Sequence, residues 1–314
     1  MKAPVMLGAV ALLSATIAAN AHDFGFGRGH DRPQTYDFQV VAAGLQRPTG
    51  IAAFNDNIVF FTQLPTPGVP GSQGGSNTVD VLFVPNGKVF NLVTGQPEPT
   101  NIALDRRGRP YWTCKSAGVI VHYTLKNGVE KILTGLDHPS GIALDRWDNI
   151  YFTELPTPGL PGSMGGSNSV DVFDGVNTTV LLSGNPAPTD IAVSWNGDAY
   201  WTCQSAGVIL KRAADGTVTH LLDNLNSPTG IALDRLGRNL YFTEVPTPGV
   251  PGDMGGQNKV WRLNLATMDL ELVHEGDPEP RDITVAPDGD LFWTCSSAGV
   301  IVKARVHRGF RWLW

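Results

Sequence analysis

Three kinds of repeat in this sequence predict an all-β fold, a six-bladed β-propeller built as three two-blade repeats. Trp-Thr-Cys tripeptides, each followed one residue later by Ser-Ala-Gly-Val-Ile, begin at Trp112, Trp201 and Trp293. Pro-Thr-Pro-Gly tetrapeptides recur in step from Pro65, Pro156 and Pro246, which defines a unit of about 90 residues. Each unit contains two variants of a Pro-Thr-Gly-Ile motif, which begin at Pro48, Pro99, Pro139, Pro188, Pro228 and Pro280. Six sub-repeats of roughly 40 to 50 residues are typical of a propeller with one blade per sub-repeat.

The amino-terminal residues 1–21 are expected to form a signal peptide. Lys2 supplies a positive charge, residues 5–17 are apolar, and Ala19-Asn20-Ala21 fits a small-x-small cleavage site. The apolar run is too short to span a bilayer. We therefore expect a secreted protein, either extracellular or periplasmic.

The remaining chain divides into three segments. Residues 22–35 are expected to be flexible, residues 36–306 to form the propeller, and residues 307–314 to form a basic, aromatic tail. The net charge of −6 provides no basic field for nucleic acid or anionic lipid. We expect a monomer with no nucleic-acid or membrane partner.

Each sub-repeat is interpreted as four short antiparallel strands. In the second one, residues 102–104 lead into a tight turn with Asp105 and Gly108, and residues 109–113 form the returning strand. Residues 118–123 and 128–133 then supply the third and fourth strands of a propeller blade.

The last sub-repeat supplies only three strands, the third of them over residues 300–305. Residues 38–45 precede the first sub-repeat and match the fourth strands of the others, such as residues 129–136. The amino-terminal strand is therefore predicted to complete the carboxy-terminal blade, which closes the ring without an unpaired edge.

The three cysteines occupy equivalent repeat positions, Cys114, Cys203 and Cys295. Equivalent atoms two blades apart are expected to lie too far apart for a disulfide, so we predict none. Three roles stay open: small buried side chains, a thiolate metal site, and a nucleophile. Cys114 is the candidate nucleophile because Lys115 is adjacent to it.

The segment from Pro139 to Glu154, Pro-Ser-Gly-Ile-Ala-Leu-Asp followed by a turn and Asn-Ile-Tyr-Phe-Thr-Glu, resembles the NHL repeat. It is also similar to the propellers of the senescence-marker/gluconolactonase, strictosidine-synthase-like and virginiamycin-B-lyase families. The resemblance covers residues 38–305. It implies the fold but not the function, because these families include lactonases, a lyase, a condensing enzyme and non-catalytic binders.

The metal-binding and catalytic residues of those enzymes have few equivalents in this chain. The resemblance implies a divalent metal held by Glu, Asn and Asp at the starts of the innermost strands. The matching positions here are Thr49, Thr100, Ser140, Thr189, Thr229 and Arg281. The Phe-Thr-Glu tripeptide of the lyases occurs at residues 152–154 and 242–244, but their catalytic histidine has no obvious counterpart.

The proline motifs and the ends of the second strands are expected to share one face around the mouth of the channel. Long Pro- and Gly-rich loops at residues 64–77, 155–168 and 245–258 belong to the same face. Such a mouth is a default ligand site in a closed β fold. The candidate ligand-binding residues there are Gln63, Asn101, Glu154, Asp190, Glu244, Arg281 and Asp282.

Carboxylates at this mouth suggest a hard cation, calcium, magnesium or zinc, with Glu154, Asp190, Glu244 and Asp282 as candidate ligands. The competing interpretation is that these carboxylates cap loops. No catalytic residue is assigned, and the candidates are Glu154, Glu244 and Cys114.

Three functions follow as hypotheses. The first is a secreted propeller that binds a small-molecule or glycan-like ligand at the looped channel mouth. The second is a cation-dependent lactone hydrolase or lyase of the gluconolactonase/virginiamycin-B-lyase type. The third is a scaffold that binds another protein. The near-identity of the three loops favours binding, because catalysis usually breaks repeat symmetry.

Overall fold

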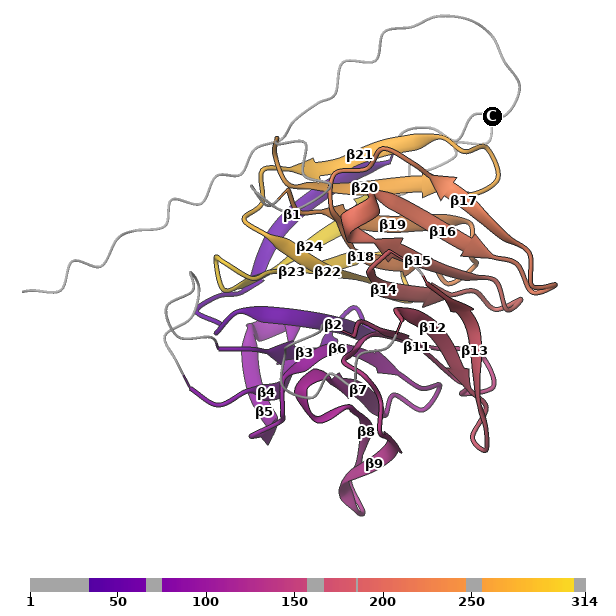
Figure 1. The fold of residues 1–314 in the computed structure, drawn as a ribbon. Helices are drawn as coiled ribbons and strands as arrows, with labels where there is room; N and C mark the ends of the chain where they lie inside the picture. Colours follow the sequence, from indigo (N-terminus) through magenta and orange to yellow (C-terminus); the bar gives the residue numbers. More distant parts are fainter. Residues whose placement is uncertain (1–33, 66–74, 157–166, 185, 247–255, 308–314) are drawn as a thin grey trace, which may run out of the picture.

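The computed structural model describes residues 34–65, 75–156, 167–184, 186–246 and 256–307. These residues form six four-stranded antiparallel sheets. The sheets follow one another around a central axis, with the first strand of each motif innermost (Figure 1). The predicted six-bladed β-propeller is confirmed. None of the described helices is long and apolar enough to cross a membrane.

The first three blades are contiguous in sequence. Blade 1 consists of β2 (Pro48–Asn55), β3 (Ile58–Gln63), β4 (Thr78–Phe83) and β5 (Lys88–Thr94). Blade 2 consists of β6 (Pro99–Leu104), β7 (Pro110–Cys114), β8 (Val119–Thr124) and β9 (Gly128–Thr134). Blade 3 consists of β10 (Pro139–Leu144), β11 (Ile150–Glu154), β12 (Ser169–Phe173) and β13 (Thr178–Ser183).

The last three blades repeat the order, except that the sixth takes its outer strand from the amino terminus. Blade 4 consists of β14 (Pro188–Val193), β15 (Ala199–Cys203), β16 (Val208–Arg212) and β17 (Val218–Leu222). Blade 5 consists of β18 (Pro228–Leu233), β19 (Asn239–Glu244), β20 (Lys259–Asn264) and β21 (Leu270–Glu275). Blade 6 consists of β22 (Pro280–Val285), β23 (Leu291–Cys295), β24 (Val300–His307) and β1 (Thr35–Ala42).

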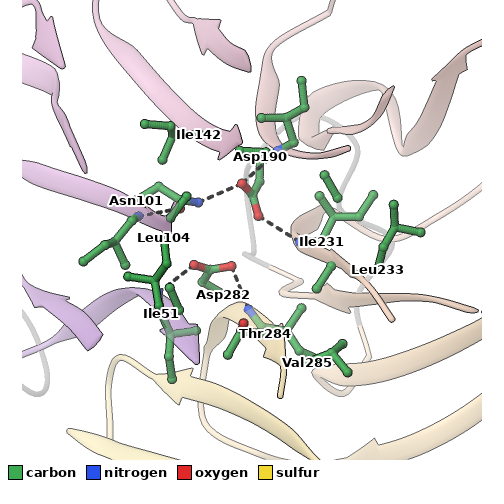
Figure 2. A pocket seen from close by; sticks show the side chains of 18 of the residues that line it. Ile51, Asn101, Leu104, Ile142, Asp190, Ile231, Leu233, Asp282, Thr284 and Val285 are labelled. Atoms are coloured by element: carbon green, nitrogen blue, oxygen red, sulfur yellow. Dashed lines mark hydrogen bonds between the residues drawn. The ribbon is translucent and has the colours of Figure 1, made fainter. Parts of the chain in front are cut away.

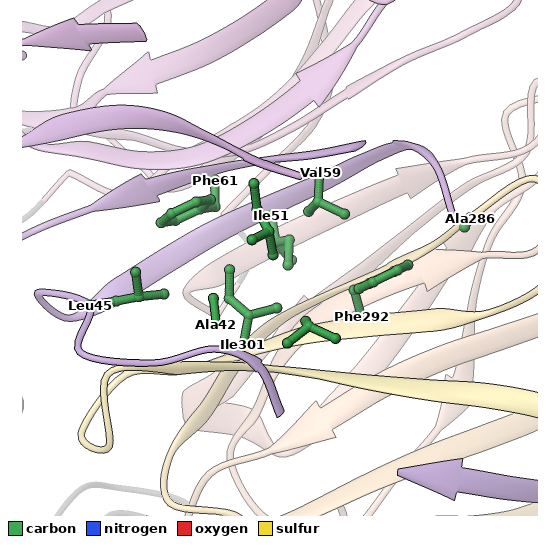
Figure 3. Close-up of a cluster of buried hydrophobic side chains, with 10 residues drawn as sticks. Ala42, Leu45, Ile51, Val59, Phe61, Ala286, Phe292 and Ile301 are labelled. Atoms are coloured by element: carbon green, nitrogen blue, oxygen red, sulfur yellow. The ribbon is translucent and has the colours of Figure 1, made fainter. Parts of the chain in front are cut away.

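The ring closes as the sequence predicts, because β1 pairs antiparallel with β24. The strand begins at Thr35 and ends at Ala42 instead of spanning residues 38–45, and β24 reaches His307. Leu45 has turned inward to join Phe61 of blade 1 and Phe292 of blade 6 in one buried cluster (Figure 3). Hydrogen bonding and apolar packing therefore both hold the seam.

The Ser-Ala-Gly repeat that follows each Trp-Thr-Cys is a tight turn with a steric requirement for glycine. In the first two copies it is a 3₁₀ helix, η2 (Lys115–Ala117) and η3 (Gln204–Ala206), and η1 (Val84–Asn86) lies in blade 1. Gly118 follows η2 with φ 60°, and a Cβ there would collide with the carbonyl oxygen of Leu136. The motif is therefore explained by backbone geometry.

Every innermost strand carries a β-bulge directly after its proline. In blade 1, Pro48 is opposite Gln63, but Ile51 is opposite Phe61, so one extra residue lies on β2. The same shift occurs in the other five blades. A bulge re-aims a side chain, and here the extra residue brings the position after Pro-Thr to the axis.

A threonine near the end of each second strand makes a hydrogen bond at the bulge. It is the middle residue of Trp-Thr-Cys in the even blades, of Phe-Thr-Glu in blades 3 and 5, and of Phe-Thr-Gln in blade 1. Its hydroxyl accepts the backbone N–H of the axial position at 2.8–3.2 Å in all six blades. In blade 4, Thr202 accepts the amide of Asp190 at 3.2 Å and donates to the carbonyl of Thr229 in blade 5 at 2.6 Å. The threonines therefore join strands within a blade and, in the even blades, link it to the next.

The residue before each proline has a positive φ although none is glycine. These residues are Arg47, Glu98, His138, Ala187, Ser227 and Glu279, with φ between 39° and 57°. Such a conformation costs free energy in an L residue. At five of the six sites the carbonyl of this residue accepts an amide from the end of the second strand, which offsets part of that cost.

We expect the substitution Thr202→Val to lower the free energy of unfolding by about 1–3 kcal/mol, because it leaves a buried amide and a buried carbonyl without partners. Chemical denaturation monitored by fluorescence measures this. Thr219→Val is the matched control, because Thr219 is exposed on β17 of the same blade, and we expect a change within about 0.5 kcal/mol. Equal effects of the two substitutions would contradict a bulge-filling role.

Candidate functional site

Three polar side chains meet at the propeller axis. They are Asn101 on β6, Asp190 on β14 and Asp282 on β22, each at the bulge of an even blade (Figure 2). Each is at least nine-tenths buried. Sequence reasoning placed all three around the channel mouth, and the structure brings them together at the axis.

Glycine occupies the axial position in the odd blades because the neighbouring strand lies too close for a side chain. A Cβ on Gly141 would lie 2.6 Å from the Cα of Asp190. The same separation is found between Gly50 and Asn101 and between Gly230 and Asp282. The alternation of glycine with a polar residue is therefore a packing requirement, which leaves room for three side chains at the axis.

Asp190 is the most extensively bonded member of this axial cluster. Its Oδ1 accepts Nδ2–H of Asn101 at 2.7 Å and the backbone N–H of Ile191 at 2.8 Å. Its Oδ2 accepts the backbone N–H of Ile231, in the next blade, at 2.9 Å. Asp190 thus connects blades 2, 4 and 5 through one carboxylate.

Asp282 repeats this arrangement at the seam between the last and first blades. Its Oδ1 accepts the backbone N–H of Ile283 at 2.7 Å, and its Oδ2 accepts that of Ile51 in blade 1 at 2.8 Å. Its carboxyl group and that of Asp190 interact electrostatically at the axis. Ionisation of one buried carboxyl group opposes ionisation of the other, so the pair favours a protonated state.

Burial raises the pKa of Asp190 to about 7, against the opposing effect of the backbone amides that it accepts. Burial, and then the negative charge of Asp190, raises the pKa of Asp282 well above its usual range. Both shifts favour protonation of this buried pair at pH values where exposed carboxyl groups are ionised. Near neutral pH the pair can act as both a hydrogen-bond donor and an acceptor.

A cavity of about 420 Å³ runs along the innermost strands from the axial cluster to their far ends. Most of its lining residues are aliphatic, but polar atoms contribute the larger part of its exposed surface. The isoleucine that follows each axial position is among the lining residues in all six blades: Ile51, Ile102, Ile142, Ile191, Ile231 and Ile283. Figure 2 labels three of them, Ile51, Ile142 and Ile231. Arg235 lines the far end, at the turn between β18 and β19. The sequence did not predict this cavity, although an isoleucine repeated after each axial position marks some of its lining residues.

The cavity lies on the opposite side of the axial cluster from the looped mouth. None of its described lining residues precedes the axial positions in the innermost strands. Residues 66–74, 157–166 and 247–255 of the long loops lie outside the described residues. Asn77 and Asn258 at the loop ends donate from Nδ2 to the carbonyls of Gln96 and Asp277, so they brace the backbone there.

Gln63, Glu154 and Glu244 occupy equivalent positions and bind the segment that precedes a proline motif. Glu154 Oε1 accepts the backbone N–H of Asp137 at 2.5 Å, and Glu244 Oε1 accepts that of Asn226 at 2.6 Å. Glu244 Oε2 also accepts Nε1–H of Trp261 at 2.7 Å. Burial raises the pKa of Glu154. These contacts are those of side chains that cap loops.

Arg281 belongs to a second charged group at the proline-motif end. Its Nε donates to Glu279 Oε1 at 2.8 Å, and Nη2 of Arg47 lies 3.9 Å from the same oxygen. Burial, partly offset by Glu279, lowers the pKa of Arg47. Arg281 thus joins blade 6 to the segment before blade 1, and it does not line the channel cavity.

The three cysteines are free and fully buried, as predicted, so the chain has no disulfide. Burial raises the pKa of Cys114 and of Cys203 to about 12 and raises that of Cys295 as well. Each packs in an apolar cluster beside the tryptophan of its own tripeptide. The thiol of Cys114 is therefore protonated and enclosed, which does not fit a nucleophile.

The carboxylates proposed as cation ligands do not converge. Across the described ranges of the chain, no group of three or more His, Cys, Asp or Glu side chains is placed to hold a metal ion. Both oxygens of Glu244 and both of Asp190 already accept N–H donors. The donor set of Glu154, Asp190, Glu244 and Asp282 therefore does not fit a shared divalent cation.

These features define a closed six-bladed propeller with a cluster of polar side chains at the end of an axial channel lined mostly by aliphatic residues. No family model matches the sequence. A gluconolactonase from Xanthomonas campestris has a similar structure, with TM-score 0.69, 16% identity, and coverage of 87% of this chain and 90% of that one. Virginiamycin B lyase from Staphylococcus aureus gives TM-score 0.55 and 16% identity over 86% and 99% of the two chains.

A chain from a nidogen/laminin complex is also similar, with TM-score 0.57, 19% identity, and coverage of 72% of this chain and 80% of that one. The resemblance to the propellers of gluconolactonases and virginiamycin B lyases is therefore confirmed at the level of the fold. The same fold occurs in proteins with enzymatic and non-enzymatic names, so function must be argued from the site.

Stability should fall as pH rises through neutrality because of the axial cluster. Folding raises the pKa of both aspartates above about 3.9, their value in an unfolded chain. Their stabilising contribution is complete below about pH 4 and is lost as pH rises through about 7, the value for Asp190. Between these pH values the free energy of unfolding falls by roughly 1.4 kcal/mol per pH unit for each proton that the folded protein retains.

The variant Asp282→Asn tests this prediction, because an asparagine donates a hydrogen bond at every pH. Thermal melting between about pH 5 and pH 8 should show a smaller fall in Tm for this variant than for the wild type. Asp288→Asn, which changes an exposed carboxyl group in the same blade, should follow the wild type. Parallel curves for all three proteins would disprove proton binding by the pair.

We expect no cysteine to react with a thiol reagent such as dithionitrobenzoate in the native protein at mildly alkaline pH. All three should react after denaturation, because unfolding exposes them and restores an ordinary thiol pKa. Absorbance of the released thiolate counts the reactive groups. Rapid reaction of one native thiol, identified as Cys114 by peptide mapping, would restore the nucleophile hypothesis.

Proposed function

We propose that this protein is a secreted, monomeric propeller that binds a small hydroxyl-bearing molecule, or the end of a glycan, in its central channel. The observation that carries the proposal is the buried pair Asp190–Asp282 with Asn101 at the end of a cavity whose lining residues are mostly aliphatic and whose exposed surface is largely polar. Convergent polar side chains in a concave pocket are a usual feature of a small-molecule site, and the polar surface suits a ligand with several hydroxyl groups. The proposed secretion rests on residues 1–21, which lie outside the described residues.

The axial cluster has hydrogen-bonding capacity to spare. Asn101 Nδ2 carries two hydrogens and uses one on Asp190, while its Oδ1 accepts a single amide from the described part of the chain, that of Ile102 at 2.6 Å. A ligand hydroxyl can accept the remaining hydrogen and donate to a carboxyl or amide oxygen. Because burial favours protonation of the pair, a neutral ligand suits this end of the channel better than an anion.

The channel wall accounts for the remainder of the ligand. The six isoleucine side chains pack in the clusters between blades, so the channel surface combines small aliphatic groups with a larger area of polar atoms. A sugar ring or lactone has hydroxyls at its edge and C–H groups on its faces, so it can contact both kinds of group. The described lining residues include no Ser, Cys, Lys or His side chain, and for this reason we favour binding over catalysis.

A cation-dependent lactone hydrolase or lyase is the alternative, supported by the names of the structural neighbours. This activity requires a calcium, magnesium or zinc ion. Glu154, Asp190, Glu244 and Asp282 fit such an ion poorly, because no three His, Cys, Asp or Glu side chains of the described residues are placed to hold a metal. A protein-binding scaffold is the third hypothesis. Both remain predictions from the sequence and the fold.

Isothermal titration of the wild-type protein with D-glucono-δ-lactone and with methyl β-D-glucoside tests binding in the channel. We expect saturable binding that Ala143→Leu weakens at least about tenfold, because the larger side chain narrows the cavity without touching the axial cluster. Ala266→Leu is the control, since Ala266 is exposed on an outer turn. Unchanged binding by the Ala143 variant would exclude the channel as the site.

The same lactone separates binding from catalysis. Its hydrolysis by the wild-type protein, measured as acid release with and without added calcium or zinc, should not exceed the uncatalysed rate. A rate that increases with the cation and is lost in Asp190→Asn would instead support the lactonase alternative.

A further inference from the structure

The turns that join the first and second strands gather at the far end of the channel. Three of them begin with Asp-Arg, at residues 105–106, 145–146 and 234–235. The aspartates stiffen these turns: Asp145 Oδ1 accepts the backbone N–H of Trp147 at 2.8 Å and of Asn149 at 3.0 Å, and Asp105 and Asp234 act in the same way. Each turn therefore presents the two residues after its aspartate to solvent.

These side chains and their neighbours define a turn face around that end of the channel. It consists of Phe54, Arg106, Arg107, Arg146, Trp147, Trp195, Arg235, Leu236 and Arg238, all of them exposed. Arg106 lies 3.6 Å from Asp148. The other four arginines have no carboxylate partner among the described residues. The chain as a whole carries a net charge of −6. The equivalent turns of blades 1 and 6 contribute Asp56 and Asp288, so the five arginines concentrate positive charge in the turns of blades 2, 3 and 5.

Two exposed indoles lie next to these guanidinium groups. Trp147 is 58% exposed and Trp195 is 59% exposed. Cζ of Arg146 lies 3.9 Å from the ring centroid of Trp147 and 5.8 Å from that of Trp195, so one cation lies near both rings. Cation–π attraction holds such a guanidinium in place while its N–H groups stay available.

The aromatic groups are themselves supported by the neighbouring blade. Trp195 in blade 4 lies 3.7 Å from the position of a Cβ on Gly237 in blade 5, and Phe54 in blade 1 packs on Gly108 in blade 2. Flat apolar surfaces therefore alternate with arginines from one blade to the next. The packing of Trp195 and Phe54 on neighbouring turns lowers the side-chain entropy that these two rings lose when a ligand binds.

We propose that the turn face binds an acidic polysaccharide, a chain of uronic acid residues, around the turn end of the channel and outside the axial cluster. The planar guanidinium of arginine matches a carboxylate in a two-point hydrogen bond. The C–H face of a pyranose ring can cover an exposed indole, which is large, flat and apolar. A polyuronate offers one carboxylate and one ring in every residue, as the turn face offers arginine and aromatic groups in successive turns.

Charge and composition favour this partner over a protein or a nucleic acid. A stable protein interface has a contiguous apolar core depleted in charge, whereas each exposed indole here has an arginine beside it. DNA carries a charge every ~1.7 Å and is bound by many cations, which five arginines on a chain of net charge −6 do not supply. A polyuronate has a lower charge density.

Titration calorimetry with a galacturonic acid hexamer tests the proposal, with maltohexaose as the neutral control. We expect the hexamer to bind, and its affinity to fall as salt concentration rises. Maltohexaose should bind at least about tenfold more weakly, because it lacks the carboxylates. A thymidine oligonucleotide of similar length provides the nucleic-acid comparison.

Three variants locate the site. Arg146→Ala, and separately Trp147→Ala, should each weaken binding of the hexamer about tenfold. Lys131→Ala removes the same charge from an exposed position on the outer strand β9, and it should leave affinity within about twofold. Asp282→Asn changes the channel alone, so unchanged hexamer binding by this variant separates the turn face from the channel function proposed above.

The proposal fails if the wild-type protein does not bind the hexamer, or binds maltohexaose equally well. It also fails if Lys131→Ala weakens binding as much as Arg146→Ala, because attraction would then reflect charge without a defined site. Tighter binding of the oligonucleotide than of the hexamer would assign the surface to nucleic acid instead.

Discussion

The bulge at the start of each innermost strand is the constraint on which the rest of the structure depends. It aims one residue per blade at the axis, and a buried threonine from the second strand accepts that residue's amide. The same hydroxyl can reach the next blade, as Thr202 does to Thr229. Without this arrangement the backbone amide of each axial residue would be buried without a hydrogen-bond partner, and this would lower the stability of every blade. Sixfold repetition of one local solution thus produces both the ring and its central site.

Close approach of the innermost strands then determines what can occupy the axis. Gly50, Gly141 and Gly230 leave no room for a Cβ, so only the even blades contribute side chains. Two of these are aspartates whose carboxyl groups interact electrostatically, and the third is Asn101. The cost of burying them is offset because they accept backbone amides from adjacent blades. The axial cluster consequently serves as a structural hub and as the polar end of the channel.

The two ends of the propeller have different chemistry. At the proline-motif end, side chains such as Glu244 are committed to backbone amides, and strained residues are held by hydrogen bonds. At the turn end, aspartates such as Asp145 stiffen the turns from within and leave arginine and tryptophan exposed. Recognition of small molecules and of polymers can therefore occur at separate places on one rigid scaffold.

The sequence by itself determined the six blades, the hairpins and the closing strand, because repeats and turn residues report local structure and each blade repeats the last. It also placed Asn101, Asp190 and Asp282 around the channel mouth and predicted that the cysteines form no disulfide. It did not reveal that Glu154 and Glu244 lie apart from those aspartates, or that burial raises the pKa of both Asp190 and Asp282. Nor did it indicate a positive φ at Arg47 and its counterparts, since none is glycine. These features were decided by the tertiary structure, because they depend on burial and on distances between blades, which a single strand does not encode.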